Sequence, residues 1–120
     1  MIIIITTFLG LTAVLLMAFI NFDRLVKIEY KNHKEEWIRD GKPRGFYWRP
    51  PELAWFAISS SLAMHNLTLK WLFKTPQWTA NDLEAKECLR KLRQYVFLFY
   101  GGLIVWLFIV ILIVNLMPAQ

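Results

Sequence analysis

Few residues in this 120-residue chain have types and spacings that could carry out chemistry. The only histidines, His33 and His65, have no second ligand at a spacing typical of metal or haem sites. His33 is surrounded by lysines and glutamates, so we expect a solvated side chain. His65 lies in an apolar run, where a hydrogen-bonded packing role is the default interpretation and a haem or chlorophyll ligand is the alternative. The sequence therefore predicts no metal site, no cofactor by default, and His65 as the candidate cofactor contact.

The residues that could act as nucleophiles lack the neighbours that would activate them. Cys88 is the only cysteine, which excludes an intrachain disulfide, and no histidine lies near it in sequence. We expect Cys88 to be a buried small apolar residue. The run Ser59-Ser60-Ser61 lacks the glycine-flanked turn of an esterase, and the chain has no glycine-rich phosphate loop. We therefore expect no catalytic residues and no enzymatic activity.

The charged residues are confined to the middle of the chain. Hydrophobic residues make up 57% of the sequence and charged residues 19%, against roughly 45–50% and a quarter in soluble proteins. All 14 basic and 9 acidic residues lie between Asp23 and Arg93. The ranges 2–20 and 95–117 contain neither a charged residue nor a histidine. This distribution excludes a soluble globule, a disordered tail and a disulfide-linked secreted module.

The two uncharged ranges predict membrane-spanning helices. A helix over 2–20 is about 28 Å long, close to the ~30 Å hydrocarbon thickness, and 95–117 is long enough to span with tilt. No basic residue precedes the first range, so we expect a retained anchor and not a cleaved signal peptide. The predicted fold is an all-α membrane protein with two terminal transmembrane helices and a cytoplasmic, partly interfacial helical region between them. The predicted parts are transmembrane helices over 1–22 and 95–117, a basic region over 23–94, and a short tail over 118–120.

Charge also predicts the orientation. Every Lys and Arg lies in the connecting region, and basic connecting segments of this length stay in the cytoplasm. Both termini are therefore expected on the non-cytoplasmic side. The net charge of +5 and the pI near 9.6 are explained by attraction to anionic lipid headgroups, and we expect no nucleic-acid binding.

A third apolar run, 53–69, is predicted to be a helix in the membrane interface or packed against a partner protein. A third span, the alternative, would place basic clusters on both sides of the membrane. Pro50-Pro51-Glu52 is typical of a helix start, and Thr75-Pro76 of a stop. The embedded stripe is predicted to contain Leu53, Phe56, Ala63, Leu67 and Trp71. Trp55, Leu62 and Leu69 fall elsewhere on the helix, and such a helix usually has protein neighbours as well as lipid.

Two further helices and a turn complete the expected layout. The range 23–37 is predicted to be a charged helical extension of the first span. The range 40–45 contains the breakers of a turn. A long helix is expected from about Ala80 through Met117, because Thr79 and Asp82 have capping-box-like spacing and no breaker follows before Gly101.

Aromatic and small residues mark candidate contacts with lipid or protein. Phe46-Tyr47-Trp48-Arg49 suits the headgroup layer, with packing of the loop as the alternative. Gly101 and Gly102 open a notch in the second span. Trp106 is expected to fill the groove between the chain's own helices, or to insert into another subunit or cofactor ring. The candidate contact residues are Phe46, Tyr47, Trp48, Arg49, Trp55, Trp71, Gly101, Gly102 and Trp106.

One segment resembles a known family. The sequence Cys88-x-Arg90-x-x-Arg93-Gln94-Tyr95, running directly into the second span, resembles the universal stress protein B family. The resemblance covers that helix and the two-span layout, and 42–74 has no counterpart in it. It implies a bacterial inner-membrane protein with a stress-related role and without an assigned catalytic activity.

Three functional hypotheses follow from these observations. The first is a non-catalytic accessory or structural subunit of a larger membrane complex, respiratory, photosynthetic or transport, with other membrane subunits as partners. The second is an independent stress-response protein of the inner membrane, as the resemblance implies. The third is a pigment- or haem-binding subunit that uses His65.

Overall fold

The computed structural model describes residues 1–53 and 57–117. Within these ranges the chain forms α-helices, one 3₁₀ helix and no strand, which confirms the predicted all-α class. The helices are α1 (Ile2–Asn32), α2 (Lys34–Arg39), α3 (Ile58–Phe73), the 3₁₀ helix η1 (Gln77–Asn81) and α4 (Leu83–Leu116).

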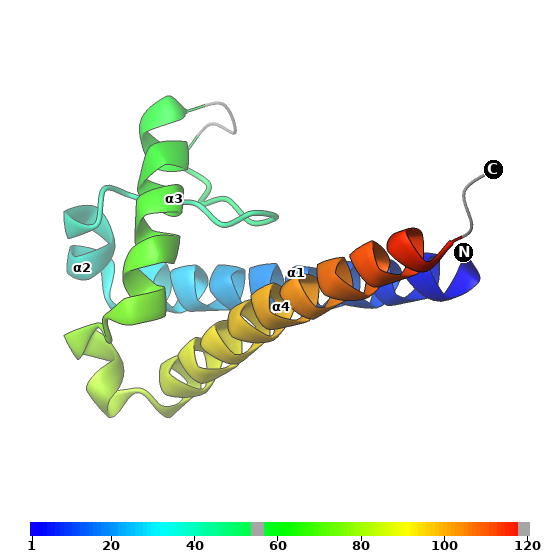
Figure 1. Cartoon of the computed structure of the whole chain (residues 1–120). Helices are drawn as coiled ribbons and strands as arrows, with labels where there is room; N and C mark the ends of the chain where they lie inside the picture. Colours follow the sequence, from blue (N-terminus) through cyan, green and yellow to red (C-terminus); the bar gives the residue numbers. More distant parts are fainter. Residues whose placement is uncertain (54–56, 118–120) are drawn as a thin grey trace.

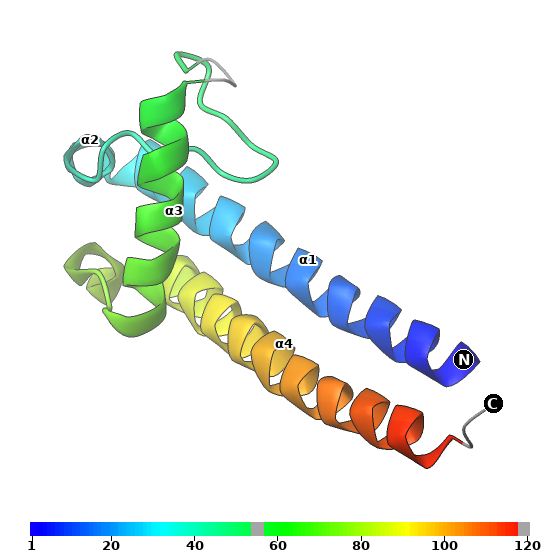
Figure 2. The ribbon, with the colours of Figure 1, turned by 45° about the horizontal axis from the view of Figure 1, so that its top comes forward.

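The long helices α1 and α4 lie side by side and run antiparallel (Figures 1 and 2). They contain 31 and 34 residues, which at ~1.5 Å per residue gives lengths of about 46 and 51 Å. The beginning of α1 and the end of α4 lie at the same end of the molecule (Figure 2). The shorter helices gather at the other end, where the charged residues lie.

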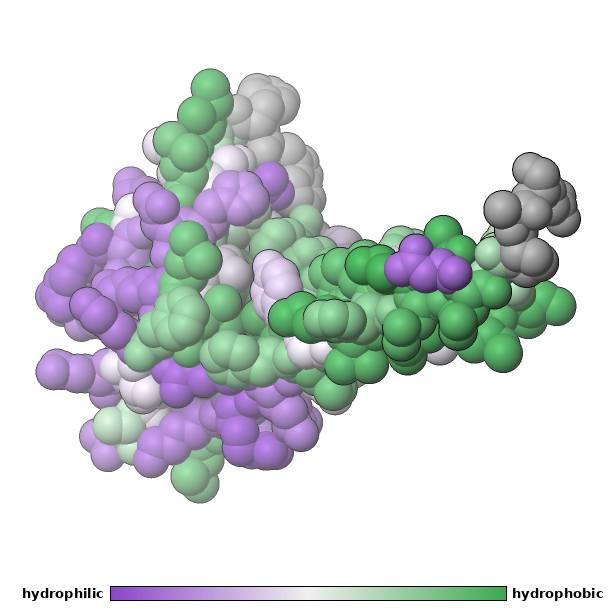
Figure 3. Space-filling view, in the orientation of Figure 1, coloured by the Kyte–Doolittle hydropathy of each residue, from purple (hydrophilic) through white to green (hydrophobic). Residues whose placement is uncertain are grey.

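Both long helices are apolar and long enough to cross a membrane, as the sequence predicted. Only 6% of the most apolar 18-residue window of each helix is buried inside the protein. The space-filling view shows hydrophobic side chains along the projecting pair of helices and hydrophilic ones around the opposite end (Figure 3). These helices are therefore unlike the core helices of a soluble protein, whose apolar residues are mostly covered by the chain itself.

The apolar parts of the two helices touch through small and aromatic residues. A Cβ on Gly102 would come within 2.6 Å of Leu11, so a glycine lets the backbones approach here. Trp106 packs against Phe8 with ring centroids 5.6 Å apart, and its indole N–H donates to the carbonyl oxygen of Ile4 at 3.3 Å. Trp106 thus occupies the groove between the chain's own helices, one of the expected alternatives. Gly101 faces away from the pair, with no atom within 4 Å of an added Cβ.

Helix α3 runs across the charged end of the pair (Figures 1 and 2). Its 16 residues extend about 24 Å, short of the ~30 Å hydrocarbon thickness. Its buried residues are Ser60, Met64, Leu67 and Trp71, which recur every three or four positions. Trp71 packs on Phe22 of α1, with ring centroids 5.4 Å apart. Among the described residues, two helices are long and apolar enough to cross a membrane, and α3 is not one of them.

Three helix boundaries differ from the prediction because side-chain contacts decide them. The extension of α1 ends at Asn32, since His33 leaves helical geometry and pairs with Asp82. The long C-terminal helix begins at Leu83 and not near Ala80, because Asp82 accepts the Ala85 N–H and caps it.

The start of the middle helix is also displaced. Pro50 and Leu53 close a turn through a backbone hydrogen bond of 3.1 Å, and α3 begins only at Ile58. The predicted turn over 40–45 is confirmed, with positive φ at Gly41 (+91°) and Lys42 (+55°). The predicted stop at Thr75-Pro76 agrees with the end of α3 at Phe73.

Candidate functional site at the junction of the apolar and ionic regions

Asp23 joins the connecting loop to α1 at the point where the first apolar range ends. Its buried carboxylate accepts the backbone N–H groups of Phe46, Tyr47 and Trp48 at 2.6, 2.7 and 3.1 Å. Burial raises the pKa of this carboxyl, while the three N–H donors favour its ionised form. A Cβ on Gly45 would lie 2.5 Å from the Asp23 carboxylate, so a glycine is needed for the loop to approach. One carboxylate thus binds three consecutive residues of the loop, and the residue before them must be a glycine.

The aromatic side chains of this loop meet α1 within its apolar range. Phe46 stacks on Phe19 with ring centroids 4.0 Å apart, and Tyr47 lies edge-on to the same ring at 6.4 Å. Tyr47 is 55% exposed. Trp48 is half-buried and packs edge-on against Tyr30 at 5.5 Å. Of the predicted aromatic cluster, Tyr47 is therefore exposed at the end of the apolar range, whereas Phe46 and Trp48 mainly pack the loop.

A second contact holds the C-terminal end of the loop. Glu52 accepts hydrogen bonds from Lys34 Nζ at 2.8 Å and from the Tyr30 hydroxyl at 2.7 Å. These bonds lower the pKa of Glu52 to about 2. The Lys34 ammonium also lies 3.5 Å from the centroid of the Tyr30 ring. The loop is thus tied at both ends to α1 and the start of α2.

Glu29 of α1 is a fully buried carboxyl that has no cationic partner among the described residues. Burial, and secondarily the nearby carboxyl of Asp40, raise its pKa to about 10, so the side chain is neutral at pH 7. Neither carboxyl oxygen forms a hydrogen bond with the described part of the chain, although the Trp78 indole lies beside it. Asp40 itself lies 3.7 Å from Lys70 Nζ of α3. A neutral Glu29 beside a paired Asp40 therefore connects α1, the end of α2 and α3.

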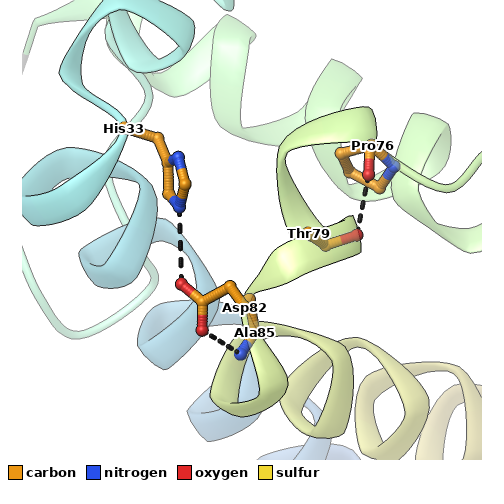
Figure 4. A network of polar contacts seen from close by, with 5 residues as sticks. All are labelled: His33, Pro76, Thr79, Asp82 and Ala85. Carbon is orange, nitrogen blue, oxygen red and sulfur yellow. Dashed lines mark hydrogen bonds and ion pairs between the residues drawn. The ribbon is translucent and has the colours of Figure 1, made fainter.

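His33 and Asp82 join the end of α1 to the start of α4 (Figure 4). His33 Nε2 lies 3.4 Å from one Asp82 carboxylate oxygen, and the other oxygen accepts the Ala85 N–H at 3.1 Å. The His33 ring also packs against Trp78, with ring centroids 4.6 Å apart. Within η1, the Thr79 hydroxyl donates to the Pro76 carbonyl at 2.7 Å. His33 is therefore a structural residue, only partly solvated.

Arg93 connects α4 to the end of α3. Its Nε donates to the Trp71 carbonyl at 2.8 Å, and its Nη2 to the Thr75 hydroxyl at 3.1 Å. One turn further along α4, Phe97 lies edge-on to Phe73, with ring centroids 6.5 Å apart. The C-terminal end of α3 is thus held at the level where the second apolar range begins.

Helix α3 has a second apolar face, opposite the buried one. It contains Ile58, Leu62, Leu69 and Phe73, which are between 58% and 75% exposed. We call these four residues the outward stripe of α3. At 100° per residue its centre lies about 180° from the buried face that contains Met64, Leu67 and Trp71. Helix α3 therefore presents one apolar face to the protein core and another to its surroundings.

The predicted contact residues divide between surface and core. Trp71 is 1% exposed and packs against Phe22 and Trp78, so the prediction that it contacts lipid or a partner is wrong. Arg49 is half-buried, and its guanidinium donates to the Leu53 carbonyl within the loop. Trp55 and Phe56 lie outside the described residues.

The predicted embedded stripe of α3 is partly core. Leu67 and Trp71 are buried, Leu53 packs against the core, and Ala63 lies close to Gly41. The candidate cofactor contact, His65, is exposed on α3 beside the outward stripe. Among the described residues, no group of three or more histidine, cysteine, aspartate or glutamate side chains could hold a metal ion.

Cys88 is buried against the core, as expected, and burial raises the pKa of its thiol. The thiol is therefore held in its unreactive, protonated form.

The roles of Asp23 and Glu29 did not follow from the sequence. Both are acidic residues within a charged helical segment, where solvated side chains are the rule. The only available signal is position, because Asp23 is the first ionisable residue after the apolar range.

Comparisons of the chain with models of protein families, with curated proteins and with solved structures find no match. The resemblance to the universal stress protein B family therefore stays a prediction.

Replacing Asp23 with Ala is expected to release the loop over 44–50. The change leaves three partly buried backbone N–H groups without their acceptor, and the cost of about 1–3 kcal/mol for a buried donor is the upper limit for each. We expect a lower midpoint of thermal unfolding in detergent micelles and faster proteolysis within the loop. Glu35→Ala, at an exposed position of α2, serves as the control. Unchanged proteolysis of the loop in Asp23→Ala would show that the carboxylate does not anchor it.

Glu29 is expected to make folding pH-dependent. Its folded pKa of about 10 exceeds the ordinary value of 4.5. The contribution of the neutral carboxyl to folding stability is therefore complete below about pH 4.5 and is lost as pH rises toward 10. Between these values, stability falls as pH rises, because the unfolded chain loses this proton before the folded chain does. Glu29→Gln removes this titration, so its thermal midpoint in micelles should exceed that of the parent at pH 9 and vary less between pH 5 and 9. If the thermal midpoint changes equally with pH in the parent and Glu29→Gln proteins, Glu29 is not the group that titrates. Glu35→Gln is the matched control.

Proposed function

We propose that the chain is an integral membrane protein in which the apolar parts of α1 and α4 cross the bilayer. The support is the uncovered apolar surface, since only 6% of the most apolar window of each helix is buried. Water contact along two such helices is unfavourable at roughly 25 cal/mol per Å² of apolar surface, and lipid removes that contact. The basic excess between Asp23 and Arg93 then favours a cytoplasmic position for the ionic region, with both termini on the other side.

Within that membrane, we propose a non-catalytic accessory role in a larger complex. The observation that carries this proposal is the outward stripe of α3, an exposed apolar face on a helix whose other side is already buried. The stripe points away from α1, because the buried face opposite it packs on Phe22 of α1. The Phe73–Phe97 contact holds its C-terminal end at the start of the second apolar range. Another membrane subunit could cover the stripe at this depth.

The side of α3 that contains Ser59, Ala63, Asn66 and Lys70, called here the polar flank, also bears on where a partner would bind. Lys70, on this flank, faces Asp40 in the chain's own ionic region, and Ala63 of the same flank lies close to Gly41. This flank contacts Asp40 and Gly41, whereas the outward stripe is exposed and apolar, so the stripe is the side of α3 that best suits a membrane neighbour. Leucine and phenylalanine side chains of this exposure suit the desolvated centre of a protein interface.

Extraction of native membranes with mild detergent, followed by native gel electrophoresis, tests this proposal. We expect the parent chain in an assembly well above its own mass of 14.2 kDa. Leu62→Lys with Leu69→Lys should release it from the assembly while it stays in the membrane fraction, because both side chains point away from the core. Ser59→Lys with Asn66→Lys adds the same charge on the polar flank and should leave the assembly intact.

Two results would contradict the accessory role. The first is migration of the parent only as a lone small species, and the second is an assembly that survives the stripe substitutions. A lone species that stays in the membrane would instead favour the stress-related alternative. The motif behind that alternative lies in α4, where Arg93 holds the end of α3.

A further inference from the structure

A groove at the charged end of the α1–α4 pair carries an excess of positive charge. It has a volume of about 540 Å³ and lies between the two helices just beyond their apolar parts. Arg24, Lys27 and Lys31 line it from α1, and Lys91 lines it from α4. Two acidic residues, Glu84 and Glu87, also line it, which leaves two positive charges in excess. Glu87 is already paired with Arg90, so the groove is more basic than this count indicates.

Asn21 lines this groove and carries an unsatisfied polar atom. Its side chain is only 2% exposed, and its Nδ2 donates to the Met17 carbonyl at 2.9 Å. Its Oδ1 is buried and has no hydrogen-bond donor among the described residues. A buried acceptor of this kind costs free energy unless a partner donates to it. A hydroxyl group of a bound molecule would supply that donor.

A second groove, apolar and of about 380 Å³, lies between the same two helices nearer their termini. Its lining includes Gly10 and Val14 of α1 and Leu98, Gly102 and Val105 of α4. On α4, Cys88 and Lys91 line the basic groove, and Leu98, Gly102 and Val105 line the apolar groove. These five residues follow one another in steps of three, four or seven. Steps of this size keep residues on one face of a helix, so the two grooves follow the same side of α4.

The spacing of the grooves matches the dimensions of a lipid. Gly10 lies 11 residues from Asn21, or about 16 Å along α1, close to half of the ~30 Å hydrocarbon core. A molecule with an anionic, hydroxyl-bearing headgroup in the basic groove could therefore place an acyl chain in the apolar groove within one leaflet.

We infer that the seam between α1 and α4 is a binding site for one anionic phospholipid. Arg24, Lys27, Lys31 and Lys91 hold its phosphate, Asn21 accepts a headgroup hydroxyl, and an acyl chain follows the apolar groove past Val14 toward Gly10. Phosphatidylglycerol has both the charge and the hydroxyls that this site requires. The inference rests on the proposed membrane insertion and adds to it a specific lipid, a defined place and a stoichiometry of one.

Native mass spectrometry of the full chain in detergent micelles tests the site. The chain is titrated separately with phosphatidylglycerol and with zwitterionic phosphatidylcholine. We expect one phosphatidylglycerol per chain, retained at least about tenfold more strongly than phosphatidylcholine. Equal retention of the two lipids would overturn the site.

Variants with matched charge separate the groove from general attraction. Lys27→Gln, Lys31→Gln and Lys91→Gln together should abolish the preference for phosphatidylglycerol. Lys42→Gln, Lys74→Gln and Lys86→Gln together remove the same charge at exposed positions outside the groove and should retain it. An equal loss in both triple variants would show that net charge, and not the site, attracts the lipid.

A glycine pair tests the acyl part of the site. An added Cβ meets nothing within 4 Å at Gly10, which lines the apolar groove, or at Gly101, which does not. Gly10→Leu should therefore fold, fill the groove and weaken phosphatidylglycerol retention several-fold, whereas Gly101→Leu should leave retention unchanged. Equal retention in the two variants would overturn the acyl position.

The two proposals fail in distinguishable ways. A chain that leaves the membrane fraction on alkaline carbonate washing would overturn membrane insertion, and with it the lipid site. A chain that stays in the membrane but retains both lipids equally would overturn the site alone.

Discussion

The apolar halves of α1 and α4 touch each other along one side and leave most of their surface uncovered by the chain, and this imbalance constrains everything else in the structure. The described part of the chain leaves both apolar windows almost entirely uncovered, so the proposed insertion into lipid is the arrangement that removes the exposed surface from water. The hydrogen bonds within each helix satisfy its backbone without outside partners, which is the condition for such a segment in lipid.

The ionic region depends on contacts placed where the apolar ranges end. Asp23 fixes the connecting loop to α1, and Arg93 fixes the end of α3 to α4. The His33–Asp82 pair joins the far ends of the same two helices. Between these contacts lies a core built around Trp37 and Trp71, with the neutral Glu29 beside it. The region thus forms a folded cap on the helix pair, which places the outward stripe of α3 and the basic groove next to the apolar surface.

The sequence predicts the long-range features of this fold because they depend on composition over many residues. The uncharged ranges at both ends identify the apolar parts of α1 and α4, and the small and aromatic residues Gly102 and Trp106 indicate where those helices meet. The turn after α2 follows from Gly41, whose positive φ few other residues adopt.

The features that the sequence does not predict depend on contacts between distant segments. Nothing local ends α1 at Asn32, because the non-helical His33 is neither glycine nor proline and is held by Asp82, 49 positions away. Trp71 has the residue type of an interfacial anchor, but it packs on Phe22 and becomes core. The candidate site is predictable in kind, as a basic and aromatic junction. Its particular residues, Asp23, Glu29 and the unsatisfied Asn21, emerge only when the helices are packed together.

The most direct test of the account is the side of the membrane on which the ionic region lies. Single cysteines at Lys31, Lys86 and Ile2, in a Cys88→Ala background, can be labelled with a membrane-impermeant maleimide in sealed vesicles of known orientation. We predict that Lys31→Cys and Lys86→Cys react from the cytoplasmic side and that Ile2→Cys reacts only from the opposite side. Reaction of the first two positions from opposite sides would contradict the two-span arrangement.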